Sequence, residues 1–187
     1  MANRTQIVAL HEGKQGRSID PLFIRALLKK LDPAWLRPWP GNNVIRTVDC
    51  GGRGTLISQL PGELRAAEQT GGSTTLMVWA DVDDDMAGPE ELKAAFWTAA
   101  QAAGISADQF SRVVFALAEA RLENWVEFLN SGVTDESKAG PRVKDSEAVR
   151  AARSLGELCL RGARLPNLPA SLEWSCRNWR ALVERMR

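Results

Sequence analysis

The feature that most constrains this chain is an apolar stretch followed at once by a run of acids. Thr75–Ala80 is predicted to be a buried strand, and Asp81-Val82-Asp83-Asp84-Asp85 follows it directly. Four carboxylates in five residues repel one another, so a cation or solvent must take up their charge. At the carboxyl end of a parallel strand, this run would stand where open α/β sheets bind their ligands.

Asp81 and Asp83 are two residues apart, so their side chains point to the same side while the chain stays extended. Two carboxylates on one side suit a hard divalent cation such as Mg2+ or Mn2+. The alternative interpretation is an acidic loop that caps the helix after Gly88-Pro89, because exposed charge is ordinary for these residue types.

The rest of the chain alternates between strand and helix patterns. Asp20 is the expected N-cap of the first helix, and Pro61-Gly62 is expected to kink or divide the second. Strands and helices joined by short connections are typical of a parallel sheet wrapped by helices. The predicted fold class is therefore α/β, a four-stranded parallel sheet flanked by helices. The predicted strands are Gln6–Leu10, Val44–Val48, Thr75–Ala80 and Arg112–Ala116, and the predicted helices are Pro21–Leu31, Thr55–Gln69, Pro89–Ala103 and Ala120–Asn130.

Residues 138–187 are expected to form a helical extension packed on an α/β domain of residues 1–137. Ser131–Lys144 is polar and contains glycine, which predicts a mobile loop, and helices are predicted at Asp145–Arg161 and Ser171–Met186. Residues 1–137 hold 13 Lys and Arg against 18 Asp and Glu, whereas the extension holds 11 against 5. This division indicates either a surface for a polyanion or two parts of one domain that attract each other.

Composition excludes several classes of protein. A chain of 187 residues is long enough for one domain with a sizeable core. No apolar run approaches the ~20 residues that span a membrane, and the N-terminus lacks the apolar region of a signal peptide. Three widely spaced cysteines and the single histidine, His11, argue against a zinc site and a disulfide framework. These features predict a cytoplasmic protein in a reducing environment.

A further acid stands at the end of the first predicted strand, where Glu12-Gly13 follows His11. Glycine allows a tight turn there and leaves space beside the carboxylate. If the first and third strands are neighbours in the sheet, Glu12 converges with Asp81 and Asp83. Such a cluster can hold one or two Mg2+ and stabilise the charge that develops at a phosphorus centre.

These motifs resemble the Toprim domain of topoisomerases, bacterial primases and OLD-type nucleases. Val8–Lys14 is similar to its first motif and Val78–Asp83 to its second, while Ala118–Trp125 resembles the acidic helix start of OLD-like and stand-alone Toprim proteins. The resemblance covers roughly residues 6–130. Many relatives place an Asp three residues after the glycine, where this chain has Gly16, and this leaves open whether activity is altered.

The resemblance implies Mg2+- or Mn2+-dependent phosphodiester chemistry on nucleic acid, by an endonuclease-type hydrolase. It implies that Glu12, Asp81 and Asp83 are the catalytic residues. Glu12 would be the general acid/base or a metal ligand, Asp81 and Asp83 would bind metal, and Asp85 would be an auxiliary ligand.

Glu119 and Glu123 are the candidates for a second metal position. If the helix begins by Ala118, they lie one turn apart on one face. An ordinary helix start, in which Glu complements the helix dipole, is the alternative.

Stand-alone Toprim proteins often resemble partners of ATPases in phage defence or genome maintenance, so an ATPase partner is a further expectation. Nucleic acid, most simply DNA, would be contacted by Lys14 and by Arg150, Arg153 and Arg164 of the basic extension. Two other functions stay open. One is a non-catalytic regulatory or binding subunit with the Toprim fold, and the other is a phosphotransfer enzyme acting on a small phosphorylated substrate.

One more motif, Gly51-Gly52-Arg53-Gly54-Thr55, stands at a predicted strand-to-helix turn. Backbone N–H groups at such a turn can bind an anion. The motif lacks the Gly-Lys-[Ser/Thr] ending of a P-loop, so it is interpreted as turn chemistry.

Overall fold

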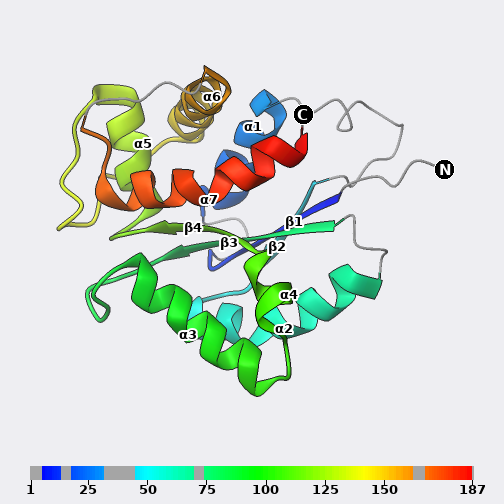
Figure 1. The fold of residues 1–187 in the computed structure, drawn as a ribbon. Coiled ribbons are helices and arrows are strands. Elements are labelled where there is room, and N and C mark those ends of the chain that lie inside the picture. The colour runs from blue at the N-terminus through cyan, green and yellow to red at the C-terminus, as the bar shows by residue number, and fades with distance from the viewer. Residues whose placement is uncertain (1–5, 14–17, 32–44, 70–73, 162–166, 187) are drawn as a thin grey trace.

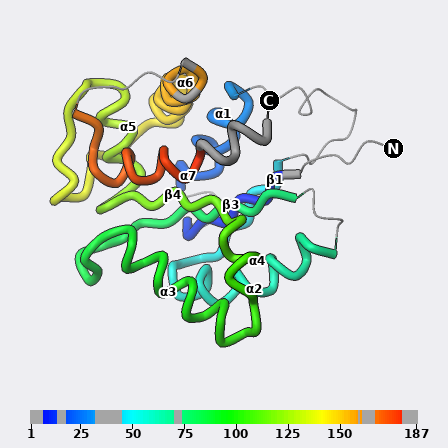
Figure 2. Tube along the Cα trace, in the orientation of Figure 1, coloured from blue at the N-terminus to red at the C-terminus, as the bar shows by residue number. Residues whose placement is uncertain are grey.

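The computed structural model describes residues 6–13, 18–31, 45–69, 74–161 and 167–186 (Figures 1 and 2). Lys14, Gly16 and Arg164 lie outside these ranges. The strands are β1 (Gln6–His11), β2 (Ile45–Asp49), β3 (Thr74–Asp81) and β4 (Val114–Ala118). The helices are α1 (Asp20–Leu31), α2 (Arg53–Gln69), α3 (Pro89–Ala102), α4 (Ala107–Ser111), α5 (Leu122–Ser131), α6 (Asp145–Arg161) and α7 (Ala170–Met186).

The four strands form one parallel sheet in the order β2-β1-β3-β4. The predicted fold class is thereby confirmed. β1 and β3 are neighbours, and their register places His11 beside Trp79. Because all strands run the same way, the residues that follow β1 and β3 meet at one edge of the sheet. The convergence of Glu12 and Asp81 required β1 and β3 to be neighbours, and they are.

Helices cover both faces of the sheet, with α1, α5, α6 and α7 on one face and α2, α3 and α4 on the other (Figure 1). The first face is built around aromatic rings. Trp79 of β3 contacts Phe23 of α1, Trp125 of α5 and Trp179 of α7, with ring centroids 5.4 to 6.3 Å apart. Strand side chains alternate between the two cores, which fixes the register of each strand.

The two C-terminal helices share the core of the first face. Ala148 and Ala152 of α6 are fully buried, and so is Leu172 of α7. α6 packs closely on α1, since a Cβ added at Gly156 would lie 2.7 Å from Lys30 Cγ. The extension therefore completes the hydrophobic core on this face of the sheet.

One predicted boundary is wrong. The fourth strand begins at Val114 instead of Arg112, because a short helix, α4, precedes it. Ser106 and Gln109 form a reciprocal capping box that starts α4. α2 is one continuous helix with Pro61 inside it, so it is not divided.

Of the helices in the described ranges, none combines the length and the apolar character needed to cross a membrane.

Candidate functional site

The edge formed by the ends of β1 and β3 brings Glu12 and Asp81 into direct contact. Glu12 Oε1 accepts a hydrogen bond from the backbone N–H of Asp81 at 3.1 Å. Asp81 Oδ1 accepts from the backbone N–H of Leu122, at the start of α5, at 3.2 Å. The second carboxylate oxygen of Glu12, Oε2, is buried and has no hydrogen-bond partner.

Asp20 joins this edge, which the sequence analysis did not foresee. Asp20 is the first residue of α1 and not the residue before it, and Ser18 Oγ accepts from the Asp20 backbone N–H at 3.1 Å and donates to the Asp20 carboxylate. The side chain of Asp20 lies against Gly13, where an added Cβ would be 2.6 Å from Asp20 Oδ2. Gly13 therefore admits a second carboxyl group beside Glu12.

The acids at this edge raise one another's pKa. Burial raises the pKa of Asp20 to about 7, and the charges of Glu123 and Glu12 contribute. The pKa of Asp81 is raised well above its usual value, chiefly by burial and then by Glu12, Asp20 and Glu123. The pKa of Glu12 is also raised by burial, although the hydrogen bond from Asp81 opposes the rise. We call Glu12, Asp20, Asp81 and Glu123 the acidic edge.

Asp83 and Asp85 lie at the rim of the acidic edge and are more exposed. Asp83 has a left-handed backbone conformation with φ of 59°, which is uncommon for a residue other than glycine. Its side chain is 57% exposed, so it can change rotamer freely. Asp85 forms a 2.5 Å ion pair with Arg53, and this hydrogen bond lowers the pKa of Asp85.

The two glutamates proposed for a second metal position are separated by the structure. Glu119 precedes α5, which begins at Leu122, so Glu119 and Glu123 do not lie one turn apart on a helix. Glu123 acts on the charges of Asp20 and Asp81. The pKa of Glu119 is raised by burial and by Glu136, in a different neighbourhood. The prediction that Glu119 and Glu123 share one face of a helix is wrong, because the chain bends after β4 before the helix starts.

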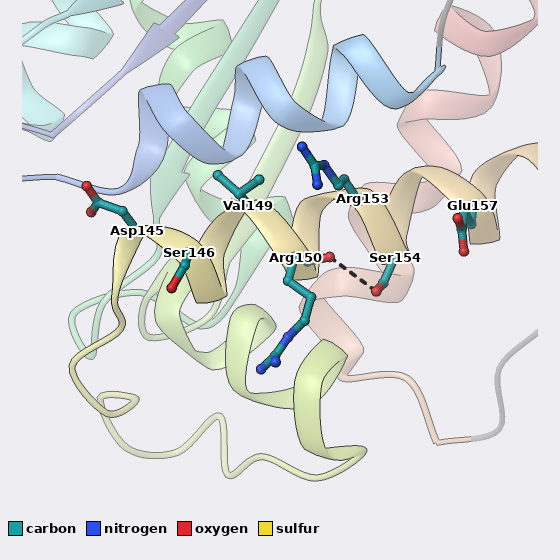
Figure 3. Close-up of a pocket in the computed structure, with 7 residues that line it drawn as sticks. All are labelled: Asp145, Ser146, Val149, Arg150, Arg153, Ser154 and Glu157. Atoms are coloured by element: carbon teal, nitrogen blue, oxygen red, sulfur yellow. Dashed lines mark hydrogen bonds between the residues drawn. The ribbon is translucent and has the colours of Figure 1, made fainter.

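The basic residues described on α6 are exposed and do not form a continuous basic surface. Arg150 and Arg153 line a shallow depression whose other lining residues include Asp145 and Glu157 (Figure 3). In Figure 3 the two arginines point away from each other, Arg150 toward α5 and Arg153 toward α1. Arg150 Nε donates to Asn130 Oδ1 at 2.8 Å.

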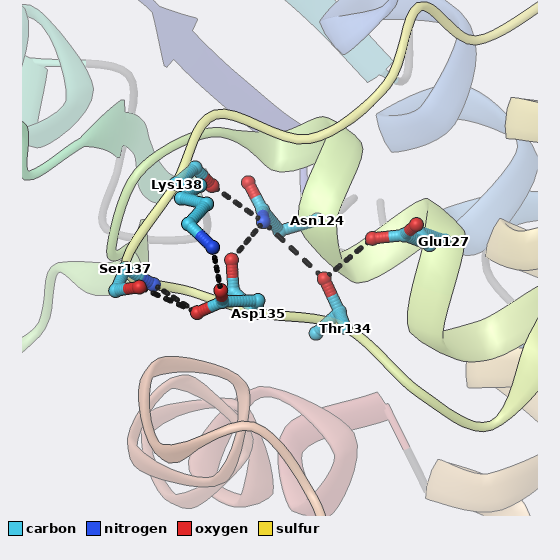
Figure 4. A network of polar contacts seen from close by, with 6 residues as sticks. All are labelled: Asn124, Glu127, Thr134, Asp135, Ser137 and Lys138. Atoms are coloured by element: carbon cyan, nitrogen blue, oxygen red, sulfur yellow. Dashed lines mark hydrogen bonds and ion pairs between the residues drawn. The ribbon is translucent and has the colours of Figure 1, made fainter.

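The segment after α5, for which the sequence predicts a mobile loop, is hydrogen-bonded to the helix through side chains. Asn124 is 1% exposed, and its Nδ2 is within 3.2 Å of Thr134 Oγ1 and the carbonyl oxygens of Asp135 and Lys138 (Figure 4). Its Oδ1 accepts from the backbone N–H of Gly140. These bonds fasten the segment to the first turn of α5.

His11 is the last residue of β1. It is 3% exposed, and burial lowers its pKa. Its Nδ1 has no hydrogen-bond partner. His11 is therefore part of the buried core at the end of β1.

Within the described ranges, no three His, Cys, Asp or Glu side chains are grouped so that they could hold a metal ion as they stand. Two observations nevertheless suit a cation at the acidic edge. Glu12 Oε2 is a buried oxygen without a partner, and the acids raise one another's pKa. Asp83, whose side chain is 57% exposed, stands at the rim beside these acids.

The chain was compared with protein-family models and with curated proteins, and neither comparison finds a match. The resemblance to the Toprim domain therefore stays a prediction that depends on the three motifs.

Proposed function

We propose that this protein is a Mg2+- or Mn2+-dependent nuclease, or a nuclease-like subunit, that performs phosphodiester chemistry on nucleic acid. The single observation that carries the proposal is the contact of Glu12 with Asp81 across two neighbouring strands, with a buried carboxylate oxygen left without a partner. Buried acids with perturbed pKa values at the carboxyl edge of a parallel sheet are typical of functional sites.

Glu12, Asp81 and Asp83 are the proposed metal ligands. A bound Mg2+ or Mn2+ supplies stabilisation of the negative charge that develops at phosphorus. Glu12 also suits proton transfer, because its raised pKa brings it closer to the pH at which it would work. The bond from Asp81 N–H holds one oxygen of Glu12 in place and leaves the other to accept a proton.

The proposed substrate, partner and location follow from the proposed nuclease function. DNA is the simplest substrate, and an ATPase partner in phage defence or genome maintenance is proposed from the Toprim resemblance. A reducing cytoplasm is the proposed location. Arg150 and Arg153 are proposed as phosphate contacts at the edge of the molecule, since exposed arginines neutralise phosphates without reading sequence.

A non-catalytic regulatory subunit is the second candidate. It is favoured by the ion pairs of Arg53 with Asp83 and Asp85, which neutralise two of the acids without any metal. A protein of this kind would keep the fold and the acidic edge while cutting nothing.

Cleavage assays distinguish the two candidates. Wild-type protein with Mn2+ or Mg2+ is incubated with supercoiled plasmid, linear DNA and RNA, and Glu12→Gln is compared with it. Glu12→Gln keeps the shape of the side chain but removes a charge and a proton acceptor, so cleavage should be lost. Asp108→Asn is the matched control, because it removes an exposed acid on α4. Full activity of Glu12→Gln would place catalysis elsewhere, and an inactive wild type would favour the regulatory subunit.

A further inference from the structure

Arg53, the first residue of α2, reaches the rim of the acidic edge. Gly51 and Gly52 precede it with φ of 71° and 143°, so the chain turns sharply between β2 and α2. Arg53 Nη1 donates to the carbonyl oxygen of Val82 at 2.6 Å, and Nη2 donates to Asp85 Oδ2 at 2.5 Å. A residue 29 positions away from Val82 in the sequence is thereby fixed beside the loop that follows β3.

In the described part of the chain, Arg53 is the cation whose charge acts on Glu12, where it opposes the rise of the pKa. Among the residues that the structure describes, the ion pairs formed by the acids of positions 81–85 all involve Arg53. The side chain is 21% exposed, so solvent and a ligand can reach it.

Arg53 has hydrogen-bond donors to spare. A guanidinium carries five N–H groups, and the bonds to Val82 and Asp85 use two of them. The approach of Nη1 to Asp83 Oδ2, at 3.5 Å, is too long for a strong hydrogen bond. Asp83 is exposed, so this contact is the one most easily given up. The planar fork that remains matches two oxygens of a phosphate group.

We propose that Arg53 binds a phosphate oxygen of the substrate, and that Asp85 and the Val82 carbonyl position it. The ligand chemistry is a phosphoryl group, supplied by a nucleic-acid backbone or by a free phosphate ester. The inference rests on the proposed function, because the phosphate bound by Arg53 would be the one that reacts beside Glu12. Asp85 then acts on Arg53 and is a positioning residue instead of a metal ligand.

Two probes test the assignment in the absence of divalent metal. Binding of a short fluorescent single-stranded DNA and of inorganic phosphate is measured for wild type, Arg53→Lys and Arg53→Met. Arg46→Met is the matched control, because Arg46 is exposed and ion-paired with Glu63 on the same face of the sheet. Arg53→Met should weaken DNA binding at least ten-fold, Arg53→Lys should weaken it less, and Arg46→Met should stay within two-fold of wild type.

Mn2+ binding, measured by electron paramagnetic resonance, separates this role from a structural one. Arg53→Met removes a positive charge near Glu12, so its affinity for Mn2+ should be unchanged or higher than that of wild type. Asp85→Asn should weaken DNA binding a few-fold and leave Mn2+ affinity unchanged. A fall of Mn2+ affinity in Asp85→Asn would make Asp85 a metal ligand and overturn its positioning role.

Several results would overturn the assignment of Arg53. The first is that Arg53→Met binds DNA as tightly as wild type. The second is that Arg53→Met loses DNA binding, Mn2+ binding and thermal stability together. The third is that the wild type binds neither probe. Dependence on Arg53 for inorganic phosphate alone would support the phosphate site and identify a small phosphate ester as its ligand. If the wild type cuts no nucleic acid and Arg53→Met nevertheless loses DNA binding, the proposed nuclease activity is refuted. The phosphate contact of Arg53 is then still supported.

Discussion

Two polar clusters meet the first turn of α5, and they differ in how well their buried groups are satisfied. On one side, Asn124 has partners for both ends of its amide, and the segment that it holds is fastened to the helix. On the other side, Asp81 accepts from the N–H of Leu122, while Glu12 keeps a buried oxygen without a partner. Both clusters hold polar groups below the surface, yet only the acidic edge leaves charge uncompensated.

The difference contrasts a polar cluster that serves the fold with one that we propose serves a ligand. Buried polar groups in native proteins are nearly always hydrogen-bonded, because an unmet group costs about 1–3 kcal/mol. The Asn124 cluster follows this rule and stabilises the structure. At the acidic edge, the buried oxygen of Glu12 departs from this rule, and a carboxylate oxygen that does so among other acids is a candidate for ligand binding.

The largest expected effect is on the satisfied cluster. Asn124→Leu removes the four hydrogen bonds that the Asn124 side chain makes to the 134–140 segment and leaves the carbonyl oxygens of Asp135 and Lys138 short of a donor. We expect the free energy of unfolding to fall by about 3 kcal/mol, measured by urea denaturation.

Ser137→Ala is the control for this variant. Ser137 is exposed and bonds only within its own turn, to Asp135, so its loss should change stability by less than ~0.5 kcal/mol. If Asn124→Leu were no more damaging than Ser137→Ala, the cluster would not hold the segment, and the contrast with the acidic edge would disappear.

The next effect is on the acidic edge and depends on pH. The pKa of Asp20 is raised from 3.8 to about 7 in the folded protein. The folded state therefore binds more protons than the unfolded state between about pH 4 and 7, and the free energy of unfolding falls as pH rises through this window. We expect the fall in wild type to exceed ~1.4 kcal/mol, which is the free energy of one pKa unit, and to be clearly smaller in Asp20→Asn. Identical profiles for the two proteins would remove Asp20 from the acidic edge.

A smaller effect is expected from a single methyl group. Gly13→Ala would drive a Cβ into Ser18 and to 2.6 Å from Asp20 Oδ2, and should destabilise the protein by about 1–2 kcal/mol. Gly62→Ala in α2 is the control. Nothing lies within 4 Å of its added Cβ, so alanine should stabilise the helix by about 0.5–1 kcal/mol. Equal melting temperatures for the two variants would show that Gly13 is not tightly packed.

The sequence was sufficient to predict the parallel sheet and the meeting of Glu12 with Asp81. Both conclusions depend on local patterns, which are an apolar strand, the acid after it and the short connection to the next helix. The sequence also carried the signal for α4, since Ser106 and Gln109 have the spacing of a capping box.

The sequence was not sufficient for contacts made across the fold. The sequence around Asp20 predicts an N-cap. The carboxylate of Asp20 lies at the acidic edge because α1 approaches Gly13 closely, which the sequence does not indicate. Asn124 stands beside an apolar stripe with nothing to mark its bonds to residues 10 to 16 positions later. Arg53 belongs to a glycine-rich turn, and its contact with Asp85 spans 32 positions.

The central claim is that the acidic edge carries charge that a divalent cation would take up. The most direct test is the melting temperature of wild type and of Asp81→Asn with Asp83→Asn, each with and without Mn2+. Wild type should gain about 1.4 kcal/mol at a Mn2+ concentration ten times the dissociation constant, because a ligand held only by the native state stabilises it. The double variant should gain nothing, and should be at least as stable as wild type without Mn2+, since repulsion is relieved. An equal Mn2+ response in both proteins would contradict the account.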